Sequence, residues 1–319
     1  MSADELRIVA ERPAPGTPRP YDFPHVARSR LPNGLTIAVV DLPGRPLVSA
    51  TLLLANGAVD EPDADAGATV LAARAVTEGT RRYDAIELVE AAERLGASVH
   101  AEAGWDATSI GVDVPSARLE PALELLAEVA LHPTFPETEV ERLRDERLND
   151  LLQAEADPRR RAEEAFVATI YSSGSPYRRP SGGLKPTVEG LDAGRLRAAY
   201  ERGLDPHRAT LIVGGELAGL DVPAIAGRLF GEWGASMRAT HSGSIVADGA
   251  VRERFVKVVH RPGSVQSEIR IGHVGLSRRI RSSSASMSAI AGTVTSVFTA
   301  ARAANGPAPR RRSNPAPAP

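Results

Sequence analysis

Two kinds of apolar spacing alternate along the first 230 residues, one typical of strands and the other of helices. The β-branched run after the turn dipeptide Asn33-Gly34 predicts a strand. The run 47–55 predicts a second strand, apolar enough to be buried on both faces. Apolar spacing of this kind predicts strands at 35–40, 47–55, 108–114, 209–215 and 251–259.

Helical spacing begins at residues 84–95, where Asp84 and Glu87 have the spacing of a capping box and Gly96 ends the helix. A long charged helix over 136–155 is broken by Asp157-Pro158. Further helices are expected from near Ser116, at 160–171, at 192–202 and from Asp221 onward. Paired strands followed by helices predict an α+β fold, a two-layer sandwich in which helices pack on a mostly antiparallel sheet.

Changes in composition predict the domain boundaries. We expect a flexible leader at 1–24, a complete α+β domain at 25–235, a polar linker at 236–250 and the start of a second, truncated domain at 251–279. Residues 280–319 contain no Asp or Glu, although the chain holds 40 of them, so we expect this tail to lack stable structure. Within the tail, residues 288–301 are the one stretch expected to form a weak helix or strand. The composition of the tail is similar to that of an out-of-frame translation of a GC-rich gene. We therefore expect another reading frame of the same DNA to continue the sequence pattern found before the tail.

Charge and composition exclude several functions. The formal net charge is −2, so no overall field would attract nucleic acid or an anionic membrane. The absence of cysteine excludes disulfides and thiol nucleophiles. The N-terminus lacks the apolar core of a secretory signal, and no stretch is long and apolar enough to span a membrane. The sequence therefore predicts a cytoplasmic protein.

Four stretches occur in an order and spacing that resemble one protein family. They are "LPNGLTIAVV", "NGAVDEPDADAG" ahead of a helix, "EGT" after it, and "PGSVQSEIRIGHVGL". Across residues 25–279 the chain resembles the insulinase, pitrilysin and mitochondrial-processing-peptidase family of zinc metallopeptidases. The resemblance implies a subunit built from two similar α+β domains in tandem. It also implies an inverted zinc motif, H-x-x-E-H, on the helix after "DADAG" in catalytic members.

This chain departs from that motif at each of its three positions, which are Val70, Ala73 and Arg74. Valine has no lone pair, alanine supplies no general base, and arginine places a permanent positive charge where zinc would sit. The third ligand that the resemblance implies would fall near Asn149-Asp150, and one carboxylate does not hold a metal. We therefore expect no catalytic residues, no metal and no cofactor here, with zinc only in a catalytic partner. The arginine and tyrosine pair that the family uses in its second domain is also missing.

The resemblance implies that the strand at 97–103 is an open sheet edge that binds peptide by adding a strand. The substrate-binding residues would then be Ser98, Val99, His100, Ala101 and Glu102. An ordinary edge strand protected by Glu102 is an equally good interpretation. The remaining features indicate no other site. The seven histidines have no ligand spacing, and the stretch 213–219 lacks the lysine of a phosphate-binding loop.

The leading hypothesis is a peptidase-inactive companion subunit, which binds peptide together with a zinc-bearing homologous subunit and contacts neither nucleic acid nor membrane. Two alternatives stay open. The chain could be an active hydrolase with an unrecognised site, which a cluster of perturbed titratable groups in a cleft would favour. It could also be a truncated product without function.

Overall fold

A six-stranded sheet forms one layer of the fold. The computed structural model describes residues 16–17, 20–234, 255–264, 266–273 and 294–301. The strands of this sheet lie in the order β1-β2-β6-β3-β5-β4, and only β2 and β6 pair in parallel. Their bounds are Ala27–Arg30 (β1), Thr36–Asp41 (β2), Leu47–Leu54 (β3), Ser98–Ala103 (β4), Thr108–Pro115 (β5) and Ala209–Gly215 (β6). The expected mostly antiparallel sheet is confirmed.

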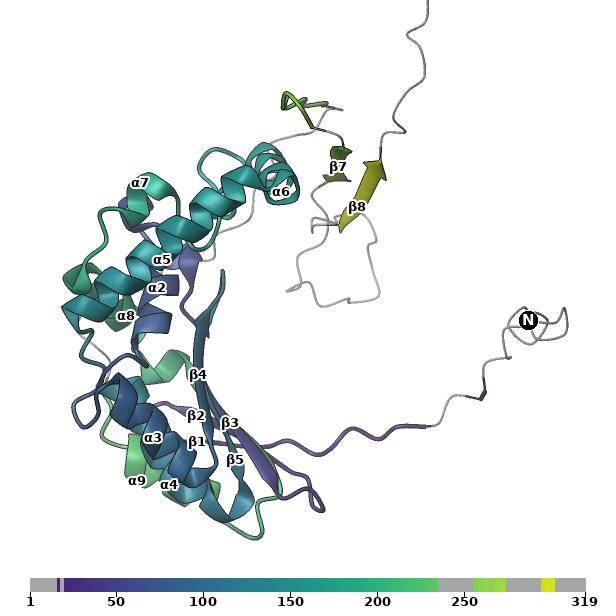
Figure 1. The fold of residues 1–319 in the computed structure, drawn as a ribbon. Coiled ribbons are helices and arrows are strands. Elements are labelled where there is room, and N and C mark those ends of the chain that lie inside the picture. Colours follow the sequence, from purple (N-terminus) through teal and green to yellow (C-terminus); the bar gives the residue numbers. More distant parts are fainter. Residues whose placement is uncertain (1–15, 18–19, 235–254, 265, 274–293, 302–319) are drawn as a thin grey trace, which may run out of the picture.

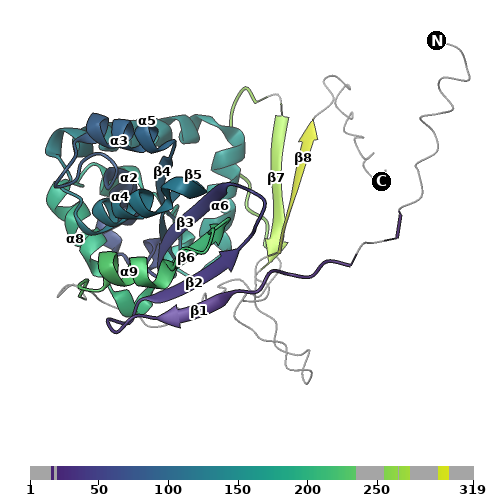
Figure 2. The ribbon, with the colours of Figure 1, turned by 90° about the horizontal axis from the view of Figure 1, so that it is seen from below.

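Helices form the second layer, on one side of the sheet (Figures 1 and 2). The helices α2, α3, α4 and α9 contact the strands directly, while α5 and α8 pack against α2. The bounds are Ala68–Ala75 (α2), Ala85–Leu95 (α3), Leu119–Leu131 (α4), Glu137–Ala156 (α5), Pro158–Ile170 (α6), Lys185–Val188 (α7), Ala193–Gly203 (α8) and Val222–Phe230 (α9). Short 3-10 turns occupy Ala58–Asp60 (η1), Asp63–Asp65 (η2), Ser116–Arg118 (η3), Pro176–Arg178 (η4) and Pro206–Arg208 (η5). None of the helices in these ranges is long and apolar enough to cross a membrane.

The core lies between the two layers, and it determines which residues of each strand are buried. In β3 the residues Val48, Ala50, Leu52 and Leu54 are buried, whereas the residues between them are exposed or half-buried. The prediction that both faces of this strand are buried was therefore wrong. The strand is central, so its neighbours shield its backbone, but helices cover only one of its faces.

The helix ends follow the local signals in the sequence. Asp84 and Glu87 form the expected capping box at the start of α3, and Gly96 adopts the left-handed conformation after it. Asp157 ends α5, and its side chain caps α6 with Pro158 in the first turn. These four helix boundaries agree with the predictions to within two residues.

The C-terminal region differs from the prediction at one strand and matches a weaker expectation at another. A strand was predicted at 251–259, but residues 255–260 form none. Residues that favour strands form one only where a neighbouring strand is available for pairing, and the local sequence does not show whether one is. Val294–Ala301, within the one stretch of the tail expected to form a weak helix or strand, forms β8, which pairs antiparallel with β7 (Gln266–His273). Its Val, Thr and Phe residues favour a strand, a local signal that the composition of the whole tail obscures.

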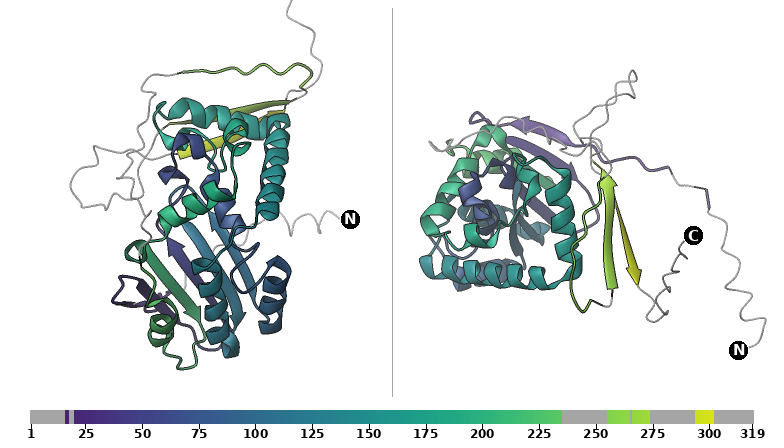
Figure 3. Two further views of the ribbon diagram at one scale, coloured as in Figure 1. Left: turned by 90° about the vertical axis from the view of Figure 1, so that its left-hand side faces the viewer. Right: turned by 90° about the horizontal axis from the view of Figure 1, so that it is seen from above.

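The pair β7–β8 lies beside α6, away from the main sheet (Figure 3). The predicted linker at 236–250 lies outside the described residues, as do most of the leader and the rest of the tail. The domain boundaries stay a prediction.

Candidate functional site

Helix α2 is held at its N-terminus by a buried carboxylate. Glu61 accepts hydrogen bonds from the backbone amides of Gly67 (3.0 Å) and Thr69 (2.6 Å), two donors that the first helical turn leaves unpaired. The Glu61 side chain is fully buried, and Arg179 lies 3.3 Å away as its ion-pair partner. Burial raises the pKa of the Glu61 carboxyl above its ordinary value, although the two amides and Arg179 act in the opposite direction. This carboxylate fixes where α2 begins.

The three motif positions on α2 have different surroundings. Ala73 is completely buried, Val70 is half-buried, and the Arg74 side chain is 44% exposed. Nη2 of Arg74 donates a hydrogen bond to Oε2 of Glu146 on α5, at 2.7 Å. A guanidinium stays protonated and has no lone pair to offer a metal. The exposed position of the motif therefore carries a charge that an acidic side chain already pairs.

Arg142 of α5 is the centre of an ion-pair network around that contact. Its guanidinium binds Glu139 at 2.7 Å and Glu146 at 2.6 Å on its own helix, and Glu78, just beyond α2, at 2.7 Å. Hydrogen bonds from Arg74 and from Arg142 lower the pKa of the Glu146 carboxyl. Glu146 and Glu78 thus join the C-terminal end of α2 to α5 by salt bridges.

Asp150, the residue nearest the expected third ligand, is also engaged by arginines. Arg160 donates to its two carboxylate oxygens at 2.7 and 3.1 Å, and Arg147 forms a further charged hydrogen bond. The hydrogen bond from Arg160 is the main reason that the pKa of Asp150 lies below its ordinary value. Binding a metal would require this carboxylate to leave two cations.

These side chains do not fit zinc. A catalytic zinc takes three protein ligands with nitrogen, sulfur or oxygen donors and keeps a fourth position for water. Val70 and Ala73 have no donor atom, Arg74 is a cation, and Asp150 is already paired. Across the described part of the chain, no group of three or more His, Cys, Asp or Glu residues could hold a metal ion.

Strand β4 lies at the edge of the sheet, where the sequence placed the expected peptide-binding strand. The amide of Gly104 donates to the carbonyl of Ala107 across the β4–β5 turn. Because alternate residues of an antiparallel strand point their backbone groups to opposite sides, residues 98, 100 and 102 pair with β5. The amides and carbonyls of Val99, Ala101 and Ala103 therefore point to the open edge, away from β5. Peptide binding by Ser98–Glu102 stays a prediction.

His100 extends over the sheet face opposite the helices. Its ring occupies the space above Gly111, where a Cβ would collide with it. Its Nδ1 lies 3.9 Å from Oδ2 of Asp113, the next residue on that face of β5. His100 is thus placed by its neighbours on β5, and its side chain borders the open edge without blocking the backbone of residues 99, 101 and 103.

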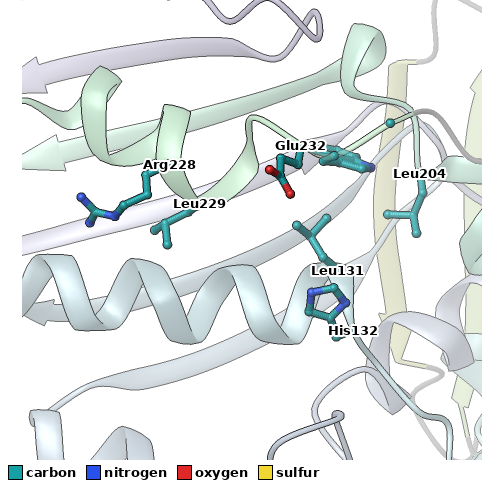
Figure 4. Close-up of a pocket in the computed structure, with 8 residues that line it drawn as sticks. Leu131, His132, Leu204, Arg228, Leu229 and Glu232 are labelled. Carbon is teal, nitrogen blue, oxygen red and sulfur yellow. The ribbon is translucent and has the colours of Figure 1, made fainter.

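A cavity of about 380 Å³ lies elsewhere, between the C-terminal ends of α4 and α9 (Figure 4). Glu232, Leu229 and Arg228 line it from the α9 side and face Leu131 and His132 at the end of α4. Its lining contains no serine, threonine or cysteine that could act as a nucleophile. The strongly buried carboxyl with a raised pKa, Glu61, belongs to the N-terminus of α2 and does not line this cavity.

Sequence reasoning missed three features of the site. Glu61 caps α2 through the amides of Gly67 and Thr69, which follow it in the sequence by six and eight residues. No local capping rule predicts a contact at this spacing. Part of the network around Arg142 could have been predicted from the sequence. Glu139, Arg142 and Glu146 have the i, i+3 and i, i+4 spacing of ion pairs on one helix. The tie from Glu146 to Arg74 required the packing of α5 on α2.

Comparisons with known proteins agree with this fold. Residues 36–180 match the profile of the insulinase family (peptidase family M16). An uncharacterized zinc protease from Mycobacterium leprae is 25% identical over 206 residues, which are 65% of this chain and 46% of that protein. The chain thus spans less than half the length of this relative.

Two solved structures share the fold. A peptidase M16 inactive domain from Pseudomonas fluorescens superposes with a TM-score of 0.68 at 21% identity, covering 80% of this chain and 61% of that chain. The first half of the periplasmic protease PqqL from Escherichia coli gives a TM-score of 0.61 at 22% identity, covering 68% of this chain and 48% of that chain. Through residues 36–180, this chain is similar to the insulinase family (peptidase family M16).

Proposed function

We propose that this chain is a peptidase-inactive member of its family, which binds extended peptide along β4 and acts with a zinc-bearing homologous subunit. The observation that carries the proposal is the salt bridge between Arg74 and Glu146 at the position of the metal motif. An arginine that forms a salt bridge with a glutamate leaves no ligand for a metal at this position. The similarity to a domain described as inactive supports the same reading.

Peptide binding is proposed because it depends on a different part of the domain. An added strand needs main-chain donors and acceptors, and the open edge offers those of Val99, Ala101 and Ala103. None of these groups involves the motif positions on α2. Binding can therefore persist where catalysis has been lost.

A partner is proposed because the same fold occurs as the first half of a longer protease, PqqL. In this arrangement the partner supplies the metal and this chain supplies part of the surface that encloses the peptide. The alternative of an unrecognised hydrolase gains no support from the cavity between α4 and α9, because its lining has no serine, threonine or cysteine.

The experiment has two stages. First, the purified full chain is measured for zinc by elemental analysis and for cleavage of quenched fluorescent peptides, with and without chelator. Second, the chain is co-expressed with a zinc-bearing homologue, followed by size-exclusion chromatography and the same peptidase assay. We expect no zinc and no cleavage alone, and co-elution with raised activity in the mixture. Stoichiometric zinc with chelator-sensitive cleavage would refute inactivity, and a homologue that elutes separately and is fully active alone would refute the partnership.

A proline substitution tests the binding edge directly. Ala101→Pro removes an outward-pointing amide, so it should weaken peptide binding while leaving the β4–β5 hydrogen bonds in place. Ala101→Ser is the matched control, because it changes the side chain at the same position and keeps the backbone donor. Equal peptide affinity in the two variants would contradict main-chain pairing on this edge, and a thermal melt verifies that both variants fold.

A further inference from the structure

Three aromatic side chains gather beyond the C-terminal end of β4. We propose that this aromatic cluster, formed by Trp105, Tyr171 and Tyr177, is a subsite for a bulky apolar side chain of the bound peptide. The ring centroids of Trp105 and Tyr177 are 5.2 Å apart, and those of Tyr171 and Tyr177 are 5.9 Å apart. The inference rests on the proposed function, because it takes the peptide on β4 as the ligand.

The cluster joins three separate elements. Trp105 lies in the β4–β5 turn, Tyr177 in η4, and Tyr171 directly after α6. All three side chains are half-buried, and none belongs to the core between the sheet and its helices. Partly exposed aromatic rings outside a core are typical of surfaces that bind apolar side chains.

The geometry of the cluster is fixed before any ligand arrives. The hydroxyl of Tyr177 donates to Oδ1 of Asp106 at 2.5 Å, which ties η4 to the β4–β5 turn. The backbone of that turn is held from the other side, since Ala58 and Val59 donate to the carbonyls of Gly104 and Trp105 at 3.0 Å each. A side chain at Gly57 would collide with the Trp105 carbonyl, so this approach requires glycine. A preformed site loses little conformational entropy on binding.

The direction of the added strand determines which part of the peptide reaches the cluster. A peptide that pairs antiparallel with β4 runs from Ala103 toward Ser98, so its N-terminal side leaves the edge at Ala103. Each residue of an extended peptide advances about 3.3 Å. The one or two residues that precede the partner of Ala103 therefore pass Gly104 and reach Trp105.

The chemistry of the surroundings defines the preferred side chain. The faces of the rings favour an aromatic or large aliphatic group. Asp106 and Glu102, both exposed, lie along this path and disfavour an acidic residue. The structure thus assigns to this site extended peptides that carry an aromatic or large aliphatic residue just N-terminal to the stretch paired with β4.

The test uses the full chain and a set of labelled extended peptides, measured by fluorescence anisotropy. The peptides are identical except that one phenylalanine moves through four successive positions, and a fifth peptide has alanine at all four. We expect one phenylalanine position to bind about tenfold more tightly than the alanine peptide, a factor that corresponds to about 1.4 kcal/mol. In Trp105→Ala and in Tyr177→Ala that gain should be absent, so that each variant binds the phenylalanine peptide no more tightly than the alanine peptide. Ile86→Ala, on the exposed face of α3, is the control and should change neither affinity.

The outcomes separate this inference from the function on which it rests. If all peptides bind with equal affinity and the cluster variants change nothing, the subsite is refuted while binding on β4 stands. If no peptide binds, the proposed function fails and the subsite fails with it. Should Trp105→Ala not fold, the emission of Trp105 in the unaltered chain replaces it, because Trp233 is buried and contributes a constant background. A blue shift with the best phenylalanine peptide and none with the alanine peptide supports the subsite, whereas identical spectra overturn it.

Discussion

Replacing Glu61 with glutamine tests how α2 is held in place. The two side chains have nearly the same shape, so the change leaves no cavity. The carboxylate accepts an amide hydrogen bond at each oxygen, from Gly67 and from Thr69. Glutamine has only one acceptor oxygen, so its NH₂ group must face one of these two N–H donors. The substitution also leaves the Arg179 guanidinium, only 11% exposed, without its counter-charge.

The expected loss follows from these contacts. A buried donor left without an acceptor costs about 1–3 kcal/mol. Removing one partner of a buried ion pair costs about 3–5 kcal/mol. Arg179 keeps one hydrogen bond, to the carbonyl of Ala58 at 3.1 Å, which reduces the second penalty. The two costs overlap, so we expect the free energy of unfolding to fall by about 3–5 kcal/mol, a shift of roughly 10 °C in Tm for a domain of this size.

The assay is equilibrium unfolding in urea, combined with hydrogen exchange at the first amides of α2. Glu78→Gln is the matched control, because Glu78 lies beyond the other end of α2 with a partly exposed side chain. It should cost less than about 1 kcal/mol. Arg179→Met combined with Glu61→Gln should be less destabilising than the sum of the two single changes, since it removes both charges together. A loss below about 1 kcal/mol for Glu61→Gln, with unchanged protection of the amides of Gly67 and Thr69, would refute the reasoning.

Three further predictions concern the network between α2 and α5. The triple variant Val70→His, Ala73→Glu and Arg74→His should not bind stoichiometric zinc by elemental analysis, because Asp150 remains paired with Arg147 and Arg160. Arg142→Ala should lower the free energy of unfolding by about 1 kcal/mol at low salt and by less in about 0.5 M salt, since its partners are partly exposed and screened; an equal loss at both salt concentrations would contradict this. Glu146 and Asp150 have pKa values below their ordinary 4.5 and 3.8, so their stabilisation is present above those values and is lost as the pH falls through the folded-state values. Glu146→Gln with Asp150→Asn should therefore flatten the loss of stability between about pH 5 and 3, measured by thermal melts across that range.

The sequence was sufficient for features that depend on local chemistry. Asp84, Gly96 and Asp157 mark helix ends through their own side chains or backbone freedom, and all three lie where they were predicted. The resemblance was also sufficient to place β4 at the sheet edge and Val70, Ala73 and Arg74 on one helix. Features that depend on distant neighbours were not predictable. The open face of β3, the pairing of β8 and the cap from Glu61 each require knowledge of which segment lies opposite.

The burial of Ala73 disfavours a general base at the middle position of the metal motif. A general base at this position would be a glutamate, which needs space and either water or a cation close to its carboxylate. Ala73 is instead 0% exposed, in a helix against which α5 and α8 both pack. Because a close-packed interior has little room for a larger side chain and an unpaired charge is costly there, restoring this glutamate would destabilise the domain. The exposed position Arg74 has gained a salt bridge to α5 that a histidine could not reproduce in its neutral, metal-binding form. The packing at Ala73 and the charge at Arg74 thus each disfavour a metal at these positions, whereas the edge of β4 involves neither residue.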